Sequence, residues 1–125
     1  MDIISKLKND VYNANMDLVK YDLVTLTWGN VSGVDRQSNK MVIKPSGVNY
    51  NELTPDHMVV VNLENELNES SLNPSSDSPT HAYLYNHFKD IKGIAHSHSV
   101  FATIFAQACK EIPCLGTTHA DHFNG

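Results

Sequence analysis

The sequence has few cysteines, no excess of positive charge and no long hydrophobic run, and each shortage excludes a class of protein. It has 9 Lys and Arg residues against 14 Asp and Glu, and no basic cluster, so we do not expect a nucleic-acid partner. No apolar stretch approaches the ~18 residues of a membrane span. The first residues lack the basic and apolar parts of a signal peptide. We therefore expect a cytoplasmic protein with no membrane partner.

The two cysteines, Cys109 and Cys114, could form a disulfide, bind a soft metal or remain inert thiols. Because no secretion signal is present, we expect inert thiols. The length of 125 residues and the apolar content of 41% are sufficient for one compact domain with its own core. No repeat, low-complexity tract or domain boundary divides the chain, so residues 1–125 are predicted to form a single domain.

Apolar spacing predicts an α/β domain. Apolar residues recur at steps of three and four from Ile4 to Leu18, which indicates an amphipathic helix over residues 2–20. Later segments show the alternation or short apolar runs typical of strands. Strands are predicted at 23–28, 31–34, 41–43, 58–63 and 94–98, a short helix from Thr54, and longer helices over 80–88 and 100–109. This order favours a layered α/β architecture around a mixed sheet.

The last two helices are each expected to bury one apolar face, because their apolar residues recur at helical spacing. Ser78 and Pro79 supply an N-cap and a first turn for the helix over 80–88. The residues expected to face inward are Ala82, Tyr85 and Phe88 in that helix, and Phe101, Ile104, Phe105 and Ala108 in the helix over 100–109.

A His-x-His pattern follows the apolar residues Ile94 and Ala95. Residues two apart in a strand point to the same face, so His96 and His98 would have α-carbons roughly 7 Å apart. At that separation both imidazoles can reach one metal ion. Surface strands also carry two histidines by chance, and the pattern alone leaves both interpretations open.

Three turns consist of small residues with free backbone N–H groups or hydroxyls, and they are Gly29-Asn30, Ser46-Gly47 and Ser75-Ser76. Such turns can cradle an anion, and Lys44 could add a positive charge beside them. Ordinary turn chemistry explains each of them equally simply. Spacing alone does not show whether they converge.

Two carboxylates have alternative interpretations. Asp77 precedes a helix N-terminus, where the helix dipole favours negative charge without any function, but it could also reach a metal or hold a histidine in its ligating tautomer. Asp121 is a candidate general base if it faces a pocket, and otherwise belongs to a solvated terminal loop. The remaining histidines in helices, His57, His81 and His87, are interpreted as surface residues or as supports for a site.

Five segments stand in an order that identifies a family. They are LVTLTWGNVS (23–32), VIKPSGV (42–48), PSSDSPTH (74–81), HSHS (96–99) and GTTHAD (116–121). With these segments the chain resembles the class II aldolase/adducin family, and within it the sugar-phosphate epimerases. The resemblance runs from the first helix to the last residue. It implies a layered α/β/α fold with a central mixed, largely antiparallel sheet.

The resemblance also implies a reaction and its site. Epimerases of the family act on a phosphorylated ketopentose and use Zn²⁺, or another divalent metal, to cleave and re-form the C3–C4 bond. By the matching motifs, Asp77, His96 and His98 would hold the metal, and Asp121 would be the catalytic acid/base. The residues implied to bind substrate are Gly29, Asn30, Lys44, Ser46, Gly47, Ser75 and Ser76.

Two alternatives stay open within the family. Its aldolases have a glutamate where this chain has Asp77, which favours an epimerase, while adducin-like members use the fold for binding or assembly without catalysis. Members of the family form tetramers and are longer, with a third histidine ligand and an interface tyrosine beyond the position of residue 125. The resemblance thus implies a chain truncated on its C-terminal side, an incomplete sheet and site, and little or no activity of these residues alone.

Overall fold

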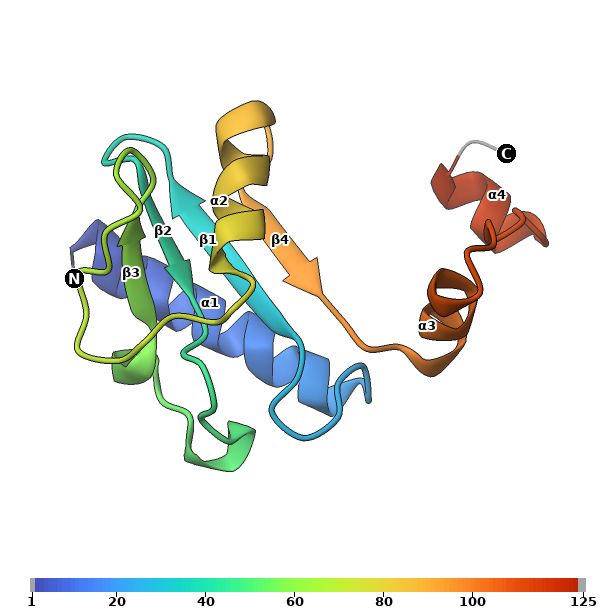
Figure 1. Ribbon diagram of the computed structural model, residues 1–125, viewed down its shortest axis with the longest axis horizontal. Helices are drawn as coiled ribbons and strands as arrows, with labels where there is room; N and C mark the ends of the chain where they lie inside the picture. Colours follow the sequence, from blue (N-terminus) through green and yellow to red (C-terminus); the bar gives the residue numbers. More distant parts are fainter. Residues whose placement is uncertain (1, 124–125) are drawn as a thin grey trace.

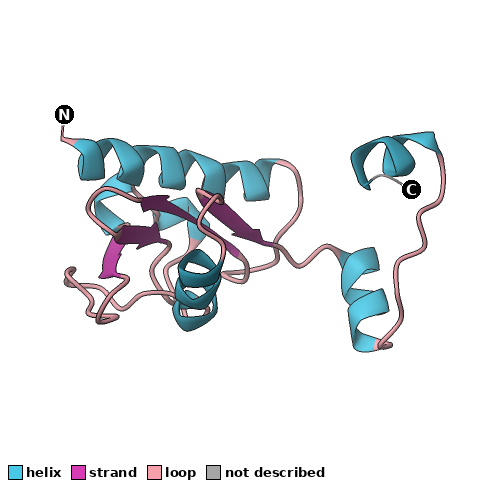
Figure 2. Cartoon of the chain, turned by 90° about the horizontal axis from the view of Figure 1, so that it is seen from above, coloured by secondary structure: helices cyan, strands magenta, loops and turns pink. Residues whose placement is uncertain are grey.

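A four-stranded sheet lies between two helices, with α1 on one face and α2 on the other (Figures 1 and 2). This computed structural model describes residues 2–123. The elements in chain order are α1 (Ile3–Lys20), β1 (Asn30–Asp35), β2 (Lys40–Ile43), the 3₁₀ helices η1 (Tyr50–Glu52) and η2 (Pro55–His57), β3 (Val59–Asn62), α2 (Ser78–His87), β4 (Gly93–His96), α3 (Val100–Gln107) and α4 (Thr117–Phe123).

The strand order is β3-β2-β1-β4, and every pairing within it is antiparallel. The α/β layering expected from the sequence is confirmed. The sheet of residues 2–123 contains no parallel pair, so the parallel part of the expected mixed sheet is absent from this portion of the chain. Strands β1, β2 and β3 follow one another as hairpins, whereas β4 returns to pair with β1 after α2.

Alternation along β1 divides its side chains between the two helical layers. Val31 and Gly33 belong to the α1 face. Asn15 of α1 hydrogen-bonds both backbone groups of Val31, donating to its carbonyl at 3.0 Å and accepting from its N–H at 2.8 Å. Gly33 allows α1 to approach, since an added methyl would lie 2.9 Å from Leu7 Cδ1 and 3.0 Å from Val11 Cγ2. The lack of a side chain at Gly33 therefore determines how closely α1 packs against the sheet.

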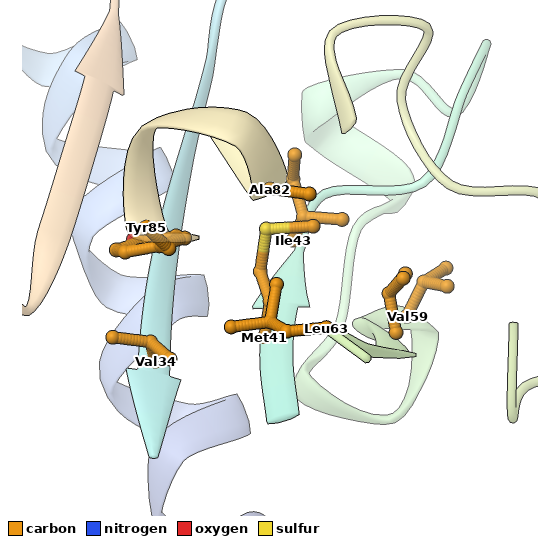
Figure 3. Close-up of a cluster of buried hydrophobic side chains, with 8 residues drawn as sticks. Val34, Met41, Ile43, Val59, Leu63, Ala82 and Tyr85 are labelled. Carbon is orange, nitrogen blue, oxygen red and sulfur yellow. The ribbon is translucent and has the colours of Figure 1, made fainter. Parts of the chain in front are cut away.

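Each face of the sheet carries its own apolar core. On the α2 face, Tyr85 and Ala82 of the helix lie over side chains from β1 and β2 (Figure 3). The buried residues of this core are Val34, Met41, Ile43, Val59, Val61, Leu63, Ala82 and Tyr85. The core on the α1 face consists of Val11, Val42, Tyr50, Leu53, Met58 and Val60. The inward orientation predicted for Ala82 and Tyr85 is confirmed.

The strand predicted over residues 23–28 is wrong, because this segment forms turns. The Trp28 N–H bonds the Thr25 carbonyl at 3.0 Å, so a backbone group that a strand would pair across a ladder is used locally. Leu26 has a φ of 55° and a side chain that is 75% exposed. The apolar–polar alternation of the segment therefore does not correspond to two faces of a sheet. The strand begins only at Asn30.

The inward orientation predicted for Phe88 and for the apolar residues of α3 is wrong. Phe88 is 56% exposed, and α3 contains no buried residue. Figure 1 shows α3 and α4 extending away from the sheet beyond β4. Within residues 2–123 no element covers the apolar side of α3, and Phe101 and Ile104 are exposed. Apolar spacing indicates what a helix can bury, but not whether a partner for that face is present.

Both cysteines are free thiols, Cys109 exposed and Cys114 partly buried. Among residues 2–123 only α1 reaches 18 residues, and it carries charged residues along its length. Among residues 2–123 there is accordingly no helix suited to crossing a bilayer.

The paired glycines Gly33 and Gly93 provide a test of the α1 contact, because they lie directly opposite each other in adjacent strands. We expect Gly33→Ala to lower the free energy of unfolding by about 1–3 kcal/mol, since its methyl would enter a filled layer. Gly93→Ala is the matched control, because its methyl would meet only the Ser32 carbonyl oxygen at 3.6 Å. Urea denaturation measures both. Equal losses in the two variants would contradict the packing described here.

Candidate active site

One pocket of about 600 Å³ opens where β1 and β4 meet three polar turns. All the residues expected from the sequence to bind substrate or metal line it. These are Gly29, Asn30, Lys44, Ser46, Gly47, Ser75, Ser76, Asp77, His96 and His98. Their convergence is a property of the fold, because they come from four segments widely separated in the chain.

The backbone of the sheet brings the two metal-candidate segments together. Asn30, the first residue of β1, is paired directly with His96, the last residue of β4. The chain then leaves the strand, and the His98 N–H donates to the Leu23 carbonyl at 2.9 Å. His98 therefore lies just beyond the strand and not within it, yet it stays on the same side, with ring centroids of His96 and His98 4.8 Å apart.

Backbone hydrogen bonds also join the two serine-containing turns. The Ser46 N–H donates to the Asn73 carbonyl at 2.9 Å, and the Ser75 N–H donates to the Lys44 carbonyl at 3.0 Å. These bonds flank an antiparallel bridge between Pro45 and Pro74. The small hydroxyl-bearing residues that follow, including Ser46 and Ser75, are thus placed on one wall of the pocket.

The Asp77 carboxylate connects α2 to both strands. Its Oδ2 accepts from Asn30 Nδ2 at 2.7 Å and from His96 Nδ1 at 2.8 Å. Burial acts to raise the pKa of Asp77, but the hydrogen bonds from His96 and Asn30 outweigh it and hold the pKa below its ordinary value. An ionised Asp77 can only accept, so the proton of the His96 ring lies on Nδ1 and Nε2 carries the free lone pair.

This donor set suits a divalent metal such as zinc. Two imidazoles and a carboxylate are among the ligands that zinc takes, and a carboxylate bonded to the second nitrogen of a histidine fixes its ligating tautomer. In the structure Asp77 accepts from the His96 ring, so it has the geometry of an orienting partner. Among residues 2–123 no three His, Cys, Asp or Glu side chains form a complete metal-holding group.

Lys44 places a buried positive charge in the wall of the pocket. It is 2% exposed, and its ammonium donates to the Val48 carbonyl at 2.9 Å and to the Thr27 carbonyl at 3.4 Å. The ammonium also lies 4.8 Å from the centre of the Tyr50 ring. Burial lowers the pKa of Lys44. Within residues 2–123 it forms no ion pair with a carboxylate, so its charge is available to an anion in the pocket.

Tyr50 holds the turn that contains Gly29. Its hydroxyl donates to the Gly29 carbonyl at 3.0 Å, and burial raises the pKa of Tyr50 to about 12. Gly29 itself has a φ of 78°, and a Cβ there would lie 2.4 Å from Val24 Cγ1. Only glycine fits this position without displacing its neighbours.

Asp121 is not part of the pocket. It lies exposed on α4, which Figure 1 shows apart from the sheet. The fold of one chain therefore does not bring Asp121 to the groups that it is expected to serve, and its role as an acid/base stays a prediction.

Sequence reasoning missed several residues of the site. Thr27 and Trp28 line the pocket but were assigned to a strand, and Gln107 reaches it from the end of α3. The Trp28 ring lies 5.6 Å from that of His98. His81 does not line the pocket; it is 2% exposed and bonded to Ser32, so the surface role among its two predicted roles is wrong.

Comparisons with known proteins identify the family. Residues 9–125 match the class II aldolase and adducin N-terminal domain. A protein of Mycoplasma pneumoniae, described as a probable L-ribulose-5-phosphate 4-epimerase UlaF, is 56% identical over 98% of this chain and 51% of its own length. The L-ribulose-5-phosphate 4-epimerase UlaF of Salmonella paratyphi C is 52% identical over 98% of this chain and 54% of its own.

Solved structures show the same fold. An L-fuculose 1-phosphate aldolase superposes with a TM-score of 0.79 at 32% identity, covering 84% of this chain and 50% of its own. The aldolase from Glaciozyma antarctica, at 15% identity, has the same TM-score over 96% of this chain and 51% of its own, which supports the fold alone. The chain belongs to the class II aldolase and adducin family. It spans about half the length of the curated relatives that it matches.

The hydrogen bonds of Asp77 predict that the folding stability of the chain depends on pH in the acid range. Because its pKa is lower in the folded chain than the ~3.9 of an unfolded aspartate, its contribution is present above that value and is lost as the pH falls through the folded pKa. We expect the stability difference between the metal-free chain and Asp77→Asn to shrink on acidification from about pH 5 to pH 3. Denaturant titrations at each pH measure this difference. Asp90→Asn, at an exposed position, is the control; a pH-independent difference for Asp77→Asn would contradict the assignment.

Proposed function

We propose that the chain forms the metal- and phosphate-binding part of an L-ribulose-5-phosphate 4-epimerase, which interconverts L-ribulose 5-phosphate and D-xylulose 5-phosphate. The convergence of two histidines, an aspartate, a buried lysine and two serine turns on one pocket carries the proposal. The names of the relatives, at 52% and 56% identity over 98% of the chain, support the reaction.

Within this proposal the residues that line the pocket have separate roles. His96 and His98 would hold zinc or another divalent ion through free ring nitrogens, and Asp77 would orient or join them. Such an ion supplies Lewis acidity to the ketose carbonyl and its neighbouring hydroxyl. The backbone N–H groups and hydroxyls of the serine turns would bind the phosphate, whose charge the Lys44 ammonium complements.

The position of Asp121 fits a site shared between subunits. Because α4 holds it away from the pocket of its own chain, we propose that Asp121 acts as acid/base at the pocket of a neighbouring subunit in a homotetramer. A cytoplasmic location belongs to the same proposal.

An aldolase reaction is the second candidate, since a solved L-fuculose 1-phosphate aldolase shares the fold at 32% identity. Both reactions cleave a carbon–carbon bond beside a carbonyl. The residue after Ser75-Ser76 distinguishes the two reactions. Aldolases of the family have a glutamate there, whereas this chain has the shorter Asp77, and one of its oxygens is bonded to both His96 and Asn30. The aspartate at this position favours the epimerase.

Metal binding is the first test. We expect isothermal titration of Zn²⁺ into the chain to show one weak site, because only two histidines and one aspartate of residues 2–123 line the pocket. His96→Ala and His98→Ala should each weaken it by more than the roughly 10–100-fold that loss of an orienting partner costs. His87→Ala, at an exposed histidine, is the matched control. Undiminished binding by both pocket variants would rule out this site.

The reaction itself can be tested in a chimera. This chain would replace the matching half of the Mycoplasma pneumoniae relative, and we expect the hybrid to convert L-ribulose 5-phosphate to D-xylulose 5-phosphate, measured by a coupled assay. The 125 residues alone should show little or no turnover, and the hybrid with His96→Ala should be inactive. A hybrid that cleaves L-fuculose 1-phosphate without epimerising L-ribulose 5-phosphate would instead establish the aldolase.

A further inference from the structure

Three polar side chains meet inside the apolar layer between β1 and α2. The Ser32 hydroxyl is hydrogen-bonded to His81 Nδ1 at 2.7 Å and to the Tyr85 hydroxyl at 2.8 Å. Their exposed fractions are 1% for Ser32, 2% for His81 and 0% for Tyr85. None of the three lines the pocket, and the proposed reaction uses none of them.

The three residues continue a line of contacts that begins in the site. Along α2, Asp77, His81 and Tyr85 are four residues apart and share one face, with steps of about 6 Å. Along β1, Asn30 and Ser32 are two residues apart and share one face, with a step of about 7 Å. Because the first steps along the two elements are of similar length, Asp77 bonds Asn30 and His81 bonds Ser32, and Tyr85 reaches the same Ser32 hydroxyl from the next turn.

Asp77 depends on this line for its position. Its side chain makes no capping hydrogen bond to its own helix, and its carbonyl accepts the first backbone bond of α2 from the His81 N–H at 3.0 Å. The place of Asp77 is therefore set by where the first turn of α2 lies over β1. Further along α2, His81 and Tyr85 bond Ser32, and Arg36, directly after β1, donates to the Tyr85 carbonyl at 2.8 Å. These polar contacts together fix the helix on β1.

Packing alone does not account for these groups. Burying a hydroxyl or an imidazole in an apolar layer costs free energy unless it is hydrogen-bonded, and apolar residues of the same shape would avoid that cost. Hydrogen bonds add what apolar contacts lack, which is a defined register between helix and strand. A shift of α2 along β1 would break both bonds of Ser32 and would also carry Asp77 away from Asn30 and His96.

We propose that Ser32, His81 and Tyr85 are positioning residues that lock α2 in register on β1 and thereby hold the Asp77 carboxylate against the His96 ring. They do not touch the substrate or the metal. The geometric part of the proposal stands on the chain alone, whereas its consequence for metal affinity rests on the proposed function.

The test compares single-hydroxyl deletions in the metal-free chain. Ser32→Ala removes both bonds of the network and Tyr85→Phe removes the one to Tyr85, and each substitution otherwise keeps the shape of the side chain. Tyr83→Phe makes the same change on the exposed side of the same helix, and Ser71→Ala makes it on an exposed loop. Nitrogen-15 spectra of the imidazoles at one fixed pH report which ring nitrogen of His96 carries the proton, and amide spectra confirm that each variant is folded.

We expect the ratio of the Nδ1–H to the Nε2–H tautomer of His96 to fall roughly threefold in Ser32→Ala and Tyr85→Phe, as when a bond to a charged group is weakened. The two controls should match the unaltered chain. Zn²⁺ affinity measured by titration should fall about 10-fold in the same two variants. If Ser32→Ala does not fold, Tyr85→Phe alone decides the result.

An unchanged His96 tautomer ratio in folded Tyr85→Phe would overturn the proposal, even if the melting temperature fell, because the network would then contribute only stability. A changed ratio in a chain that binds no Zn²⁺ would leave the positioning role intact and count against the proposed function. The two failures are therefore distinguishable.

Discussion

Strand β1 is hydrogen-bonded along both edges and covered on both faces, and the other elements take their positions from it. Its edges pair with β2 and β4, Gly33 lets α1 approach one face, and Ser32 fastens α2 to the other. The first residue of the strand, Asn30, is also the point where the pocket begins. The position of β1, which orders the layers, thus also places the Asn30 side chain against Asp77 and Ser75.

The net charge of the sequence does not predict which charges meet in the pocket. The formal charge of the sequence is −5, yet the wall beside the serine turns holds a buried ammonium paired only with carbonyl oxygens among residues 2–123. In the same pocket an ionised carboxylate, Asp77, orients His96. A buried ammonium and potential metal ligands in one pocket are consistent with the phosphorylated substrate proposed above.

Much of this arrangement could be predicted from the sequence, and the exceptions have physical reasons. The first helix, the strands around Val42 and Val60 and the helix from Ser78 were predicted because their apolar periods match the faces they bury. The segment 23–28 alternates in the same way but uses its backbone in a turn. His81 could have been suspected from its four-residue spacing to Asp77, but the partner that buries it, Ser32, lies far away in the chain.

The pairing of Asn30 with His96 has a consequence for how the protein folds. Strands β1 and β2 are joined by a short turn and β2 is joined to β3 by a longer connection that contains η1 and η2, whereas β4 can join β1 only after the chain has passed through β2, β3 and α2. Contacts between distant segments carry the larger loop-closure entropy and form late. We therefore expect the groups that meet at Asp77 to come together late in folding, after the pairing of β1 with β2.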